Sequence, residues 1–270
     1  MATSRIQSLG IKRKSSNEDD KQQGKKLLPL TETQIEDKLL ISDNKLSFSF
    51  FNVNCEILAH LLLGQNLVRC IGGQRVSGKI VETEAYLGLE DKAAHTYNGK
   101  RTERNEAMFM APGTAYVYNI YGMYCCLNIS SQEKVFTEEM LYLQVEGEGC
   151  AVLIRALEPQ EGLEIMKTHR SKNSTNSTKE LKVKELTNGP SKLCQALAIS
   201  KNDFNKCNLT NSELLWLEQG ETIPDEKIVC SPRINIGYAE EWQEKPLRFY
   251  ILGNSCVSKR DKKAEEHRYS

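Results

Sequence analysis

Two carboxylates and a tyrosine alternate along an otherwise apolar stretch, IVETEAYL at 80–87. In a β-strand, Glu82, Glu84 and Tyr86 share one face, because successive side chains point to opposite sides. Positions two apart are separated by about 7 Å, near the distance at which inverting glycosidases place a water between two carboxyl groups. One carboxylate that activates water also suits other hydrolyses with an oxocarbenium-like transition state. A solvent-facing sheet edge is the alternative.

A cation stands inside a second apolar stretch, CAVLIRALEP at 150–159. A buried guanidinium such as that of Arg155 needs an anionic partner. Glu84, or a phosphate bound near it, would supply the negative charge. An internal Arg–Glu pair that only stabilises the fold is the competing interpretation.

The tyrosine-rich stretch YVYNIYGMYCCLNIS at 116–130 is typical of a β-hairpin. Tyr118 offers a flat ring, and a base stacked on such a ring gains about 1–3 kcal/mol. Asn128, on the opposite strand, could hydrogen-bond a base edge or exclude a wrong substituent. Tyr121 precedes Gly122 at the turn, where the protein's own core cannot easily bury it. We expect this ring to wedge into a DNA base stack, whereas Tyr116 is expected to be structural.

The polar stretch at 89–113 has no clear period and predicts a long loop. His95 lies in this loop, and loops on rigid scaffolds often carry functional side chains. Three cations and a hydroxyl follow it: Lys100, Arg101, Thr102 and Arg104. Such groups suit contacts to a phosphate backbone, although a solvated basic loop is the simpler alternative.

The elements that would position these side chains follow from hydrophobic period. The opposite face of the first strand should meet the core through Val81, Thr83, Ala85 and Leu87. Other strands are expected from Leu67, in the hairpin at 114–130, and at 150–159, 233–242 and 245–252. Helices are expected from Cys55 to Gly64, at 161–170 and at 189–200, the last with a proline at its start. One α+β domain at 45–259, around a curved, largely antiparallel sheet with a protruding hairpin, is the predicted fold.

Composition limits the partners and cofactors. The 270 residues carry 36 basic and 36 acidic side chains, so any DNA-binding patch must be local. Nine cysteines without a CxxC pair, and only four histidines, predict reduced thiols and no metal site. No run of about 18 apolar residues is present, so no membrane span is expected.

The two ends of the chain are expected to be tails. Residues 1–44 are polar and charged, which predicts disorder. The basic clusters at 12–14 and 25–26 resemble a bipartite nuclear-import signal, with a solvated tail as the alternative. Nuclear localisation is therefore expected, and a mitochondrial pool is compatible with it. Residues 260–270 are expected to form a flexible C-terminal tail.

Several blocks, in order, resemble the alkyladenine (3-methyladenine) DNA glycosylase family: IVETEAYLG, RN..MFM.PGTAYVYNIYGMY, LNISSQ, RALEP.EGLE, GPSKLCQALAI and KPLRFY. The resemblance implies a monofunctional enzyme without metal or redox cofactor. It would flip damaged purines (3-methyladenine, 7-methylguanine, hypoxanthine or ethenoadenine) out of duplex DNA and hydrolyse the N-glycosidic bond to start base excision repair. A monomer that binds damaged double-stranded DNA is expected, and the sequence identifies no repair-protein partner.

The resemblance also implies roles for particular residues. Glu84 resembles the general base that activates water, and Arg155 resembles its partner in holding that water and the nucleotide's phosphate. The implied base pocket consists of Tyr86, His95, Tyr118 and Asn128. Tyr121 matches the family's intercalating tyrosine. The implied DNA contacts are Thr102, Arg104, Met123, Tyr124 and Lys192.

One segment departs from the family pattern. Residues 133–149 carry five glutamates and one lysine where the family has a very short link. Folded over the binding face, such a segment would weaken DNA affinity electrostatically. Two other functions compete with the glycosylase: a catalytically weak or inactive nucleic-acid-binding module of the same fold, and a carbohydrate glycosidase using Glu82 and Glu84.

Overall fold

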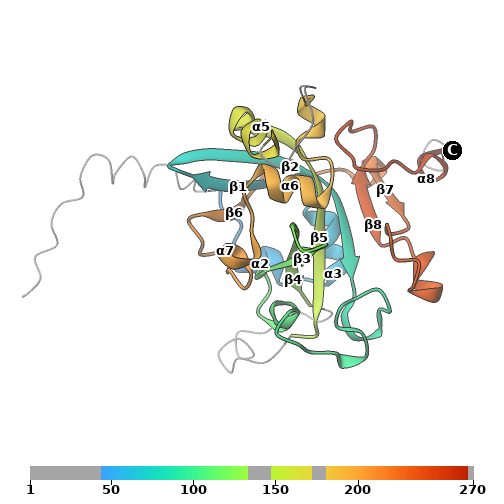
Figure 1. The fold of residues 1–270 in the computed structure, drawn as a ribbon. Coiled ribbons are helices and arrows are strands. Elements are labelled where there is room, and N and C mark those ends of the chain that lie inside the picture. The colour runs from blue at the N-terminus through green and yellow to red at the C-terminus, as the bar shows by residue number, and fades with distance from the viewer. Residues whose placement is uncertain (1–43, 133–146, 172–180, 267–270) are drawn as a thin grey trace, which may run out of the picture.

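Eight antiparallel strands form one curved sheet (Figure 1). This computed structural model describes residues 44–132, 147–171 and 181–266. The strands are β1 (Asn66–Ile71), β2 (Gln74–Tyr86), β3 (Ala115–Ile120), β4 (Tyr124–Ser131), β5 (Cys150–Glu161), β6 (Leu215–Glu218), β7 (Ile228–Ser231) and β8 (Arg248–Ile251). Their order is β3-β4-β5-β2-β1-β6, and β8 pairs with both β2 and β7. The predicted single α+β domain around a largely antiparallel sheet is confirmed.

The short α-helices of the described residues pack against this sheet, most of them into one hydrophobic core. They are α2 (Phe48–Phe51), α3 (Cys55–Leu61), α5 (Leu163–Ser171), α6 (Pro190–Ala196), α7 (Lys201–Phe204) and α8 (Lys262–Glu266). The helix expected from Cys55 ends before Gly64, whose φ of 86° favours glycine. Its core face differs slightly from the expected pattern, because Ile57 and Leu61 are exposed whereas Leu58 and Leu62 are buried. The expected helix at 189–200 begins at Pro190.

The strand β2 contains an irregularity that changes which side chains share a face. In its pairing with β5, Ile80 opposes Leu157 and Glu82 opposes Ala156, so Val81 has no partner on β5. Thr83 and Ala85 are buried on the core side, where Thr83 donates to the carbonyl of Ala59. Val81 instead packs in a separate cluster with Tyr250. The prediction that Val81 shares the core face was therefore wrong, because a β-bulge breaks the period of two.

The hairpin β3–β4 has the predicted form. Tyr116 pairs with Asn128, and Tyr118 pairs with Cys126. The turn contains Tyr121 at φ 50° and Gly122 at φ 74°. β4 also pairs with β5, so β3, β4 and β5 are neighbours in the sheet. Side chains on one face of these three strands point away from the main core. That face carries the candidate site.

Hydrogen bonds connect the residues that flank the acidic segment. The insert predicted at 133–149 lies outside the described residues except for its last three, 147–149. The side-chain oxygen of Gln132 accepts from the backbone N–H of Glu148 at 3.1 Å. Gly147 donates to the carbonyl of Phe109 at 2.8 Å. We call the Gln132–Glu148 contact the neck of the insert.

The predicted helices and strands differ most from the structure in the C-terminal third of the chain. Residues 233–242 form no strand; they are a loop that ends in a 3-10 helix at Glu240–Gln243. The strands β6 and β7, of four residues each, were not predicted. The expected strand at 245–252 is confirmed as β8.

The expected tails are described only in part. The basic clusters at 12–14 and 25–26 lie outside the described residues, as does the stretch 267–270. Residues 260–266 do not form the flexible tail expected of them, because they include α8 (Figure 1). Glu265 of this helix is buried and accepts a hydrogen bond from the Tyr250 hydroxyl at 3.0 Å. Within the described ranges no helix is long and apolar enough to cross a membrane.

Candidate active site

A cavity of about 220 Å³ opens on the face of the sheet that points away from the main hydrophobic core. β2, β3, β4 and β5 contribute its floor and walls, and the loop after β7 closes one side. Seven residues singled out from the sequence line it: Glu84, Tyr86, His95, Tyr118, Tyr121, Asn128 and Arg155. The five predicted DNA-contact residues do not line it: Thr102, Arg104, Met123, Tyr124 and Lys192. The residues of the expected base pocket thus line the cavity, whereas these expected DNA contacts lie outside it.

Glu84 is fully buried at the inner end of this cavity. One oxygen, Oε1, accepts from the backbone N–H of Ile234 at 2.8 Å and lies 3.2 Å from Nη1 of Arg155. The other, Oε2, accepts from the Tyr86 hydroxyl at 2.9 Å. A carboxylate has about four acceptor positions. Three donors from described residues therefore leave one position on Glu84 for a further donor.

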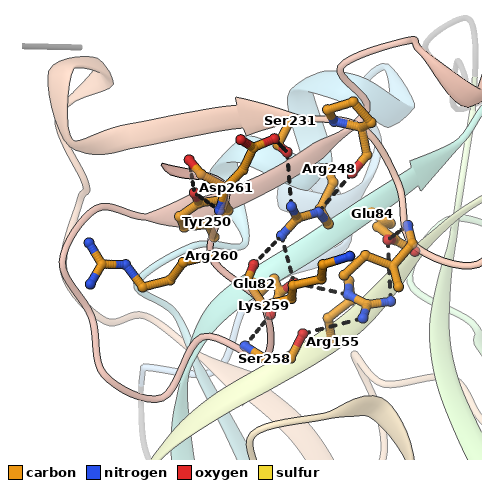
Figure 2. A network of polar contacts seen from close by, with 12 residues as sticks. Glu82, Glu84, Arg155, Ser231, Arg248, Tyr250, Ser258, Lys259, Arg260 and Asp261 are labelled. Atoms are coloured by element: carbon orange, nitrogen blue, oxygen red, sulfur yellow. Dashed lines mark hydrogen bonds and ion pairs between the residues drawn. The ribbon is translucent and has the colours of Figure 1, made fainter. Parts of the chain in front are cut away.

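Glu82 has a different environment from Glu84 and does not line the cavity. Its Oε1 accepts from Arg155 Nε and Arg248 Nη1, each at 3.0 Å, and its Oε2 accepts from the Ser258 N–H at 2.7 Å (Figure 2). Arg155 thus pairs with both carboxylates. The predicted contact with Glu84 is present, and so is a buried Arg–Glu pair, with Glu82, that stabilises the fold. A glycosidase that uses both carboxylates finds no support in this geometry, because Glu82 is enclosed by cations and a backbone donor.

Burial of Arg155 does not remove its charge. Desolvation lowers the pKa of its guanidinium, but the nearby carboxylates of Glu84 and Glu82 outweigh that effect and raise the pKa above the usual value. The guanidinium stays positive beside Glu84. A fixed cation at this point would favour any negative charge that enters the cavity next to the carboxylate.

Aromatic rings form the walls of the cavity. Tyr118 and His95 meet edge to face, with ring centroids 4.8 Å apart. The Tyr116 hydroxyl lies 2.8 Å from His95 Nδ1. Tyr116 is almost fully buried, so its expected structural role is consistent with its position, and it also orients the imidazole.

Tyr86 connects the aromatic wall to the carboxylate. Burial raises the pKa of its phenol well above the usual value, and the charge of Glu84 adds to this effect. The hydroxyl therefore remains a donor to Glu84. The guanidinium of Arg233 lies 4.7 Å from the centre of the Tyr86 ring and forms a buried ion pair with Asp91. Neither Arg233 nor Asp91 was recognised from the sequence.

His95 is held neutral. Burial lowers the pKa of its imidazole to about 4, and the charges of Arg104 and Lys100 act in the same direction. A neutral ring can lie against a cationic purine without charge repulsion. Asn105 fixes the backbone of the same loop, because its side-chain amide donates to the carbonyls of His95 and Lys100.

The lowered pKa of His95 predicts that acid destabilises the fold. Between pH 6.5 and about 4 the unfolded chain binds a proton that the folded chain does not, so this contribution to stability is complete above pH 6.5 and is lost as the pH falls. The upper bound is about 3.5 kcal/mol, at about 1.4 kcal/mol per pKa unit, and solvent contact with the imidazole reduces it. Urea unfolding at pH 7 and pH 4.5 should show a larger loss for the native chain than for His95→Gln. Equal losses would contradict a neutral buried imidazole.

Outside the cavity, the tip of the hairpin projects into solvent. Tyr121 is 89% exposed and Met123 is 73% exposed. Arg104 is also exposed, with its guanidinium 5.1 Å from the centre of the Tyr118 ring. Lys192 Nζ donates to the side chain of Asn188 at 2.7 Å. Two large side chains are thus exposed at the tip, and the Arg104 cation lies against a ring that lines the cavity.

Four residues of the loop after β7 line the cavity and were missed in the sequence: Ile234, Asn235, Ile236 and Tyr238. The stretch RINIGYAEEW was interpreted as a strand. Pro232 before it and Gly237 within it were the available signals of a loop. Asn235 has a φ of 62°, which a regular strand excludes.

Comparison with known proteins gives the same family across most of the chain. A model of the methylpurine-DNA glycosylase (MPG) family matches residues 49–255. The chain is 49% identical over 225 residues to a human protein named DNA-3-methyladenine glycosylase, covering 82% of this chain and 70% of that protein. The mouse protein of the same name is 49% identical over 226 residues, covering 82% of this chain and 63% of its own length.

A bacterial relative shows that the shared part can be a whole protein. The putative 3-methyladenine DNA glycosylase of Clostridium perfringens strain 13 is 46% identical over 217 residues, which cover 80% of this chain and all of that protein. The match between this chain and the family model includes β1 to β8 and every residue that lines the cavity. The chain therefore belongs to the methylpurine-DNA glycosylase family.

Proposed function

We propose that this chain is a monofunctional DNA glycosylase that flips damaged purines out of duplex DNA and hydrolyses the bond from base to sugar, as the first step of base excision repair. The observation that supports this most is the buried carboxylate of Glu84 at the end of an aromatic cavity, with the exposed ring of Tyr121 at its rim. The names of the relatives favour 3-methyladenine as a substrate. 7-Methylguanine, hypoxanthine and ethenoadenine are further proposed substrates.

Glu84 is the proposed general base. Its one remaining acceptor position suits a water, whose proton the carboxylate would take as the oxygen attacks the sugar carbon. Tyr86, Ile234 and Arg155 hold the carboxylate in place. Arg155 would also bind the phosphate of the flipped nucleotide. The bond from the sugar carbon to the base breaks as the water oxygen attacks. A cationic alkylated base leaves as a neutral molecule, whereas a neutral base such as hypoxanthine needs protonation to leave.

The aromatic walls are the proposed binding site of the flipped base. Tyr86 and His95 would stack on one side of the purine and Tyr118 on the other. Alkylation makes the base cationic, which strengthens its attraction to electron-rich rings and improves it as a leaving group. Asn128 donates to the carbonyl of Tyr116, which fixes its amide where it would crowd the 2-amino group of guanine. Normal guanine would be rejected by this contact.

Residues around the cavity are proposed to bind the duplex. Tyr121 would fill the space that the base leaves, with Met123 and Tyr124 next to it. Thr102, Arg104 and Lys192 would contact the backbone. We also propose that the protein acts as a monomer in the nucleus, with a mitochondrial pool compatible with the same activity. No lysine lines the cavity among the described residues, so no strand cleavage through a Schiff base is proposed.

The activity can be tested directly. The full chain is incubated with a duplex that carries one hypoxanthine or one ethenoadenine, and abasic sites are measured as alkali-sensitive breaks. Base release supports the proposed function, and an undamaged duplex is the control. Binding of the damaged duplex without base release would instead favour an inactive nucleic-acid-binding module.

Tyr121→Ala is expected to weaken binding of damaged duplex and to impair base flipping. Unstacking a base step costs a few kcal/mol, and a wedging ring offsets part of this cost, so affinity should fall by about 10- to 100-fold. The melting temperature should not change, because a side chain that is 89% exposed leaves no cavity in the core. Leu214→Ala, at another exposed apolar residue, serves as the control. A collapse in stability would show that the ring belongs to the core.

A further inference from the structure

A second hollow, of about 430 Å³, adjoins the base cavity and is strongly basic. The two share Ile234 and Asn235 as lining residues, so the loop after β7 separates them. The outer wall of the second hollow consists of residues 259–263. Its cationic lining residues are Arg233, Arg248, Lys259, Arg260, Lys262 and Lys263. We call this hollow the basic groove.

Three of the six cations already have anionic partners. Arg233 pairs with Asp91, Arg248 pairs with Glu82, and Arg260 Nε donates to Glu265 at 2.8 Å. The remaining three, Lys259, Lys262 and Lys263, are exposed and form no ion pair with any residue that the structure describes. They are therefore available to an external anion.

The one acidic residue that lines the groove offsets only part of the charge of these lysines. Asp261 lines the groove, but its carboxylate is engaged by neighbouring residues. Its Oδ2 accepts from the Ser231 hydroxyl at 2.6 Å, and its Oδ1 accepts from the Ala264 N–H at 3.2 Å. Three exposed lysines against this one carboxylate leave the open side of the groove with a net positive charge, on a chain whose formal net charge is zero.

The backbone that carries the lysines is fixed to the buried network around Glu82 (Figure 2). Ser258 donates its N–H to Glu82, and the carbonyl of Lys259 accepts from Arg248 Nη1 at 2.8 Å. The N–H of Asp261 donates to the Tyr250 hydroxyl at 2.9 Å. Binding to a segment that is already ordered costs less conformational entropy than binding to a free tail.

We propose that the basic groove binds the phosphate backbone of the DNA strand next to the flipped nucleotide, through Lys259, Lys262 and Lys263. Lysine is a point charge that suits phosphate contacts without base specificity. The shared wall at Ile234 and Asn235 places these charges beside the cavity into which the nucleotide turns. The groove deepens the proposed glycosylase function and rests on it, because it adds a contact site for the same substrate.

Salt dependence of binding tests this directly. Each phosphate contact adds about 0.9 to the slope of log affinity against log salt on B-DNA. The full chain with Lys259→Gln, Lys262→Gln and Lys263→Gln should therefore bind an undamaged 25-base-pair duplex with a slope smaller by about 3. The matched control replaces three lysines that line neither hollow: Lys182→Gln, Lys201→Gln and Lys227→Gln. Its slope should equal that of the native chain.

Further variants test DNA binding by the groove independently of glycosylase activity. Replacing the same three groove lysines by arginine should restore the native slope, since the charge is kept. Three results would each contradict DNA binding by the groove lysines. They are an unchanged slope in the glutamine variant, an equal loss of slope in the control, and no restoration of the slope by arginine. Binding to undamaged duplex needs no chemistry, so absence of base release by the native chain would overturn the proposed function and leave this measurement valid.

Discussion

Glu84→Gln is expected to lower the single-turnover rate of base excision by about 1,000-fold. General acid–base catalysis contributes about 10²- to 10⁴-fold, and a glutamine cannot accept the proton of an attacking water. The amide keeps one oxygen for the donors that surround the carboxylate. Some stability should be lost, but the chain should stay folded and bind duplex, because Arg155 keeps Glu82 as an anionic partner. The rate is measured on a hypoxanthine duplex with protein in excess.

The control for this variant is Glu226→Gln, which removes the same charge at an exposed site. Its excision rate should equal that of the native chain. Equal rates for Glu84→Gln and the native chain would exclude Glu84 as the base. The enzyme could then still be a glycosylase, with another group activating the water.

Glu82→Gln is expected to lower the free energy of unfolding by about 3–5 kcal/mol. Removing one member of a buried ionic network leaves the others buried without compensation. Here Arg155 and Arg248 would both lose an anion, and both side chains are largely buried. Arg155 would keep Glu84 as a partner, so most of the cost falls on Arg248. Urea unfolding at pH 7 measures the loss. Excision should also slow, because Arg155 would lose one of the two carboxylates that fix its position.

Glu161→Gln provides the matched comparison. Glu161 also pairs with an arginine, Arg75, but its side chain is 51% exposed. Surface pairs of this kind contribute about 0–1 kcal/mol. If Glu82→Gln cost no more than Glu161→Gln, the buried network would not be a source of stability.

Much of the fold could be predicted because its long elements have a regular period. β2, β5 and the β3–β4 hairpin are apolar and alternate clearly, and α6 begins at a proline. The bulge at Val81 could not be predicted, since it depends on the pairing of β2 with β5. The loop after β7 was mistaken for a strand because Ile234 and Ile236 alternate as strand residues do, although they face the cavity from an irregular backbone.

The candidate site was predictable in its residues but not in their connections. Glu82 and Glu84 are equivalent in the alternation of the strand. The family resemblance favoured Glu84 as the base, and the tertiary structure shows how the contacts of the two carboxylates differ. Glu82 contacts Arg248 and Ser258, which lie more than 160 residues away along the chain. Local sequence carries no information about such contacts. The same is true of the ion pair between Arg233 and Asp91, which spans 142 positions.

The neck of the insert has a consequence for how freely the chain can vary at this point. The Gln132 side chain accepts from the backbone of Glu148, so the two ends of the intervening segment are held close to each other by residues outside most of it. This contact does not depend on how many residues lie between them. The entropic free-energy cost of closing a loop grows only slowly with loop length, by about 0.6 kcal/mol for each doubling. Segments of very different length can therefore connect β4 to β5 without moving Asn128 or Arg155. The link is thus a natural position for insertion and for evolutionary divergence, beside a cavity whose strands stay in register.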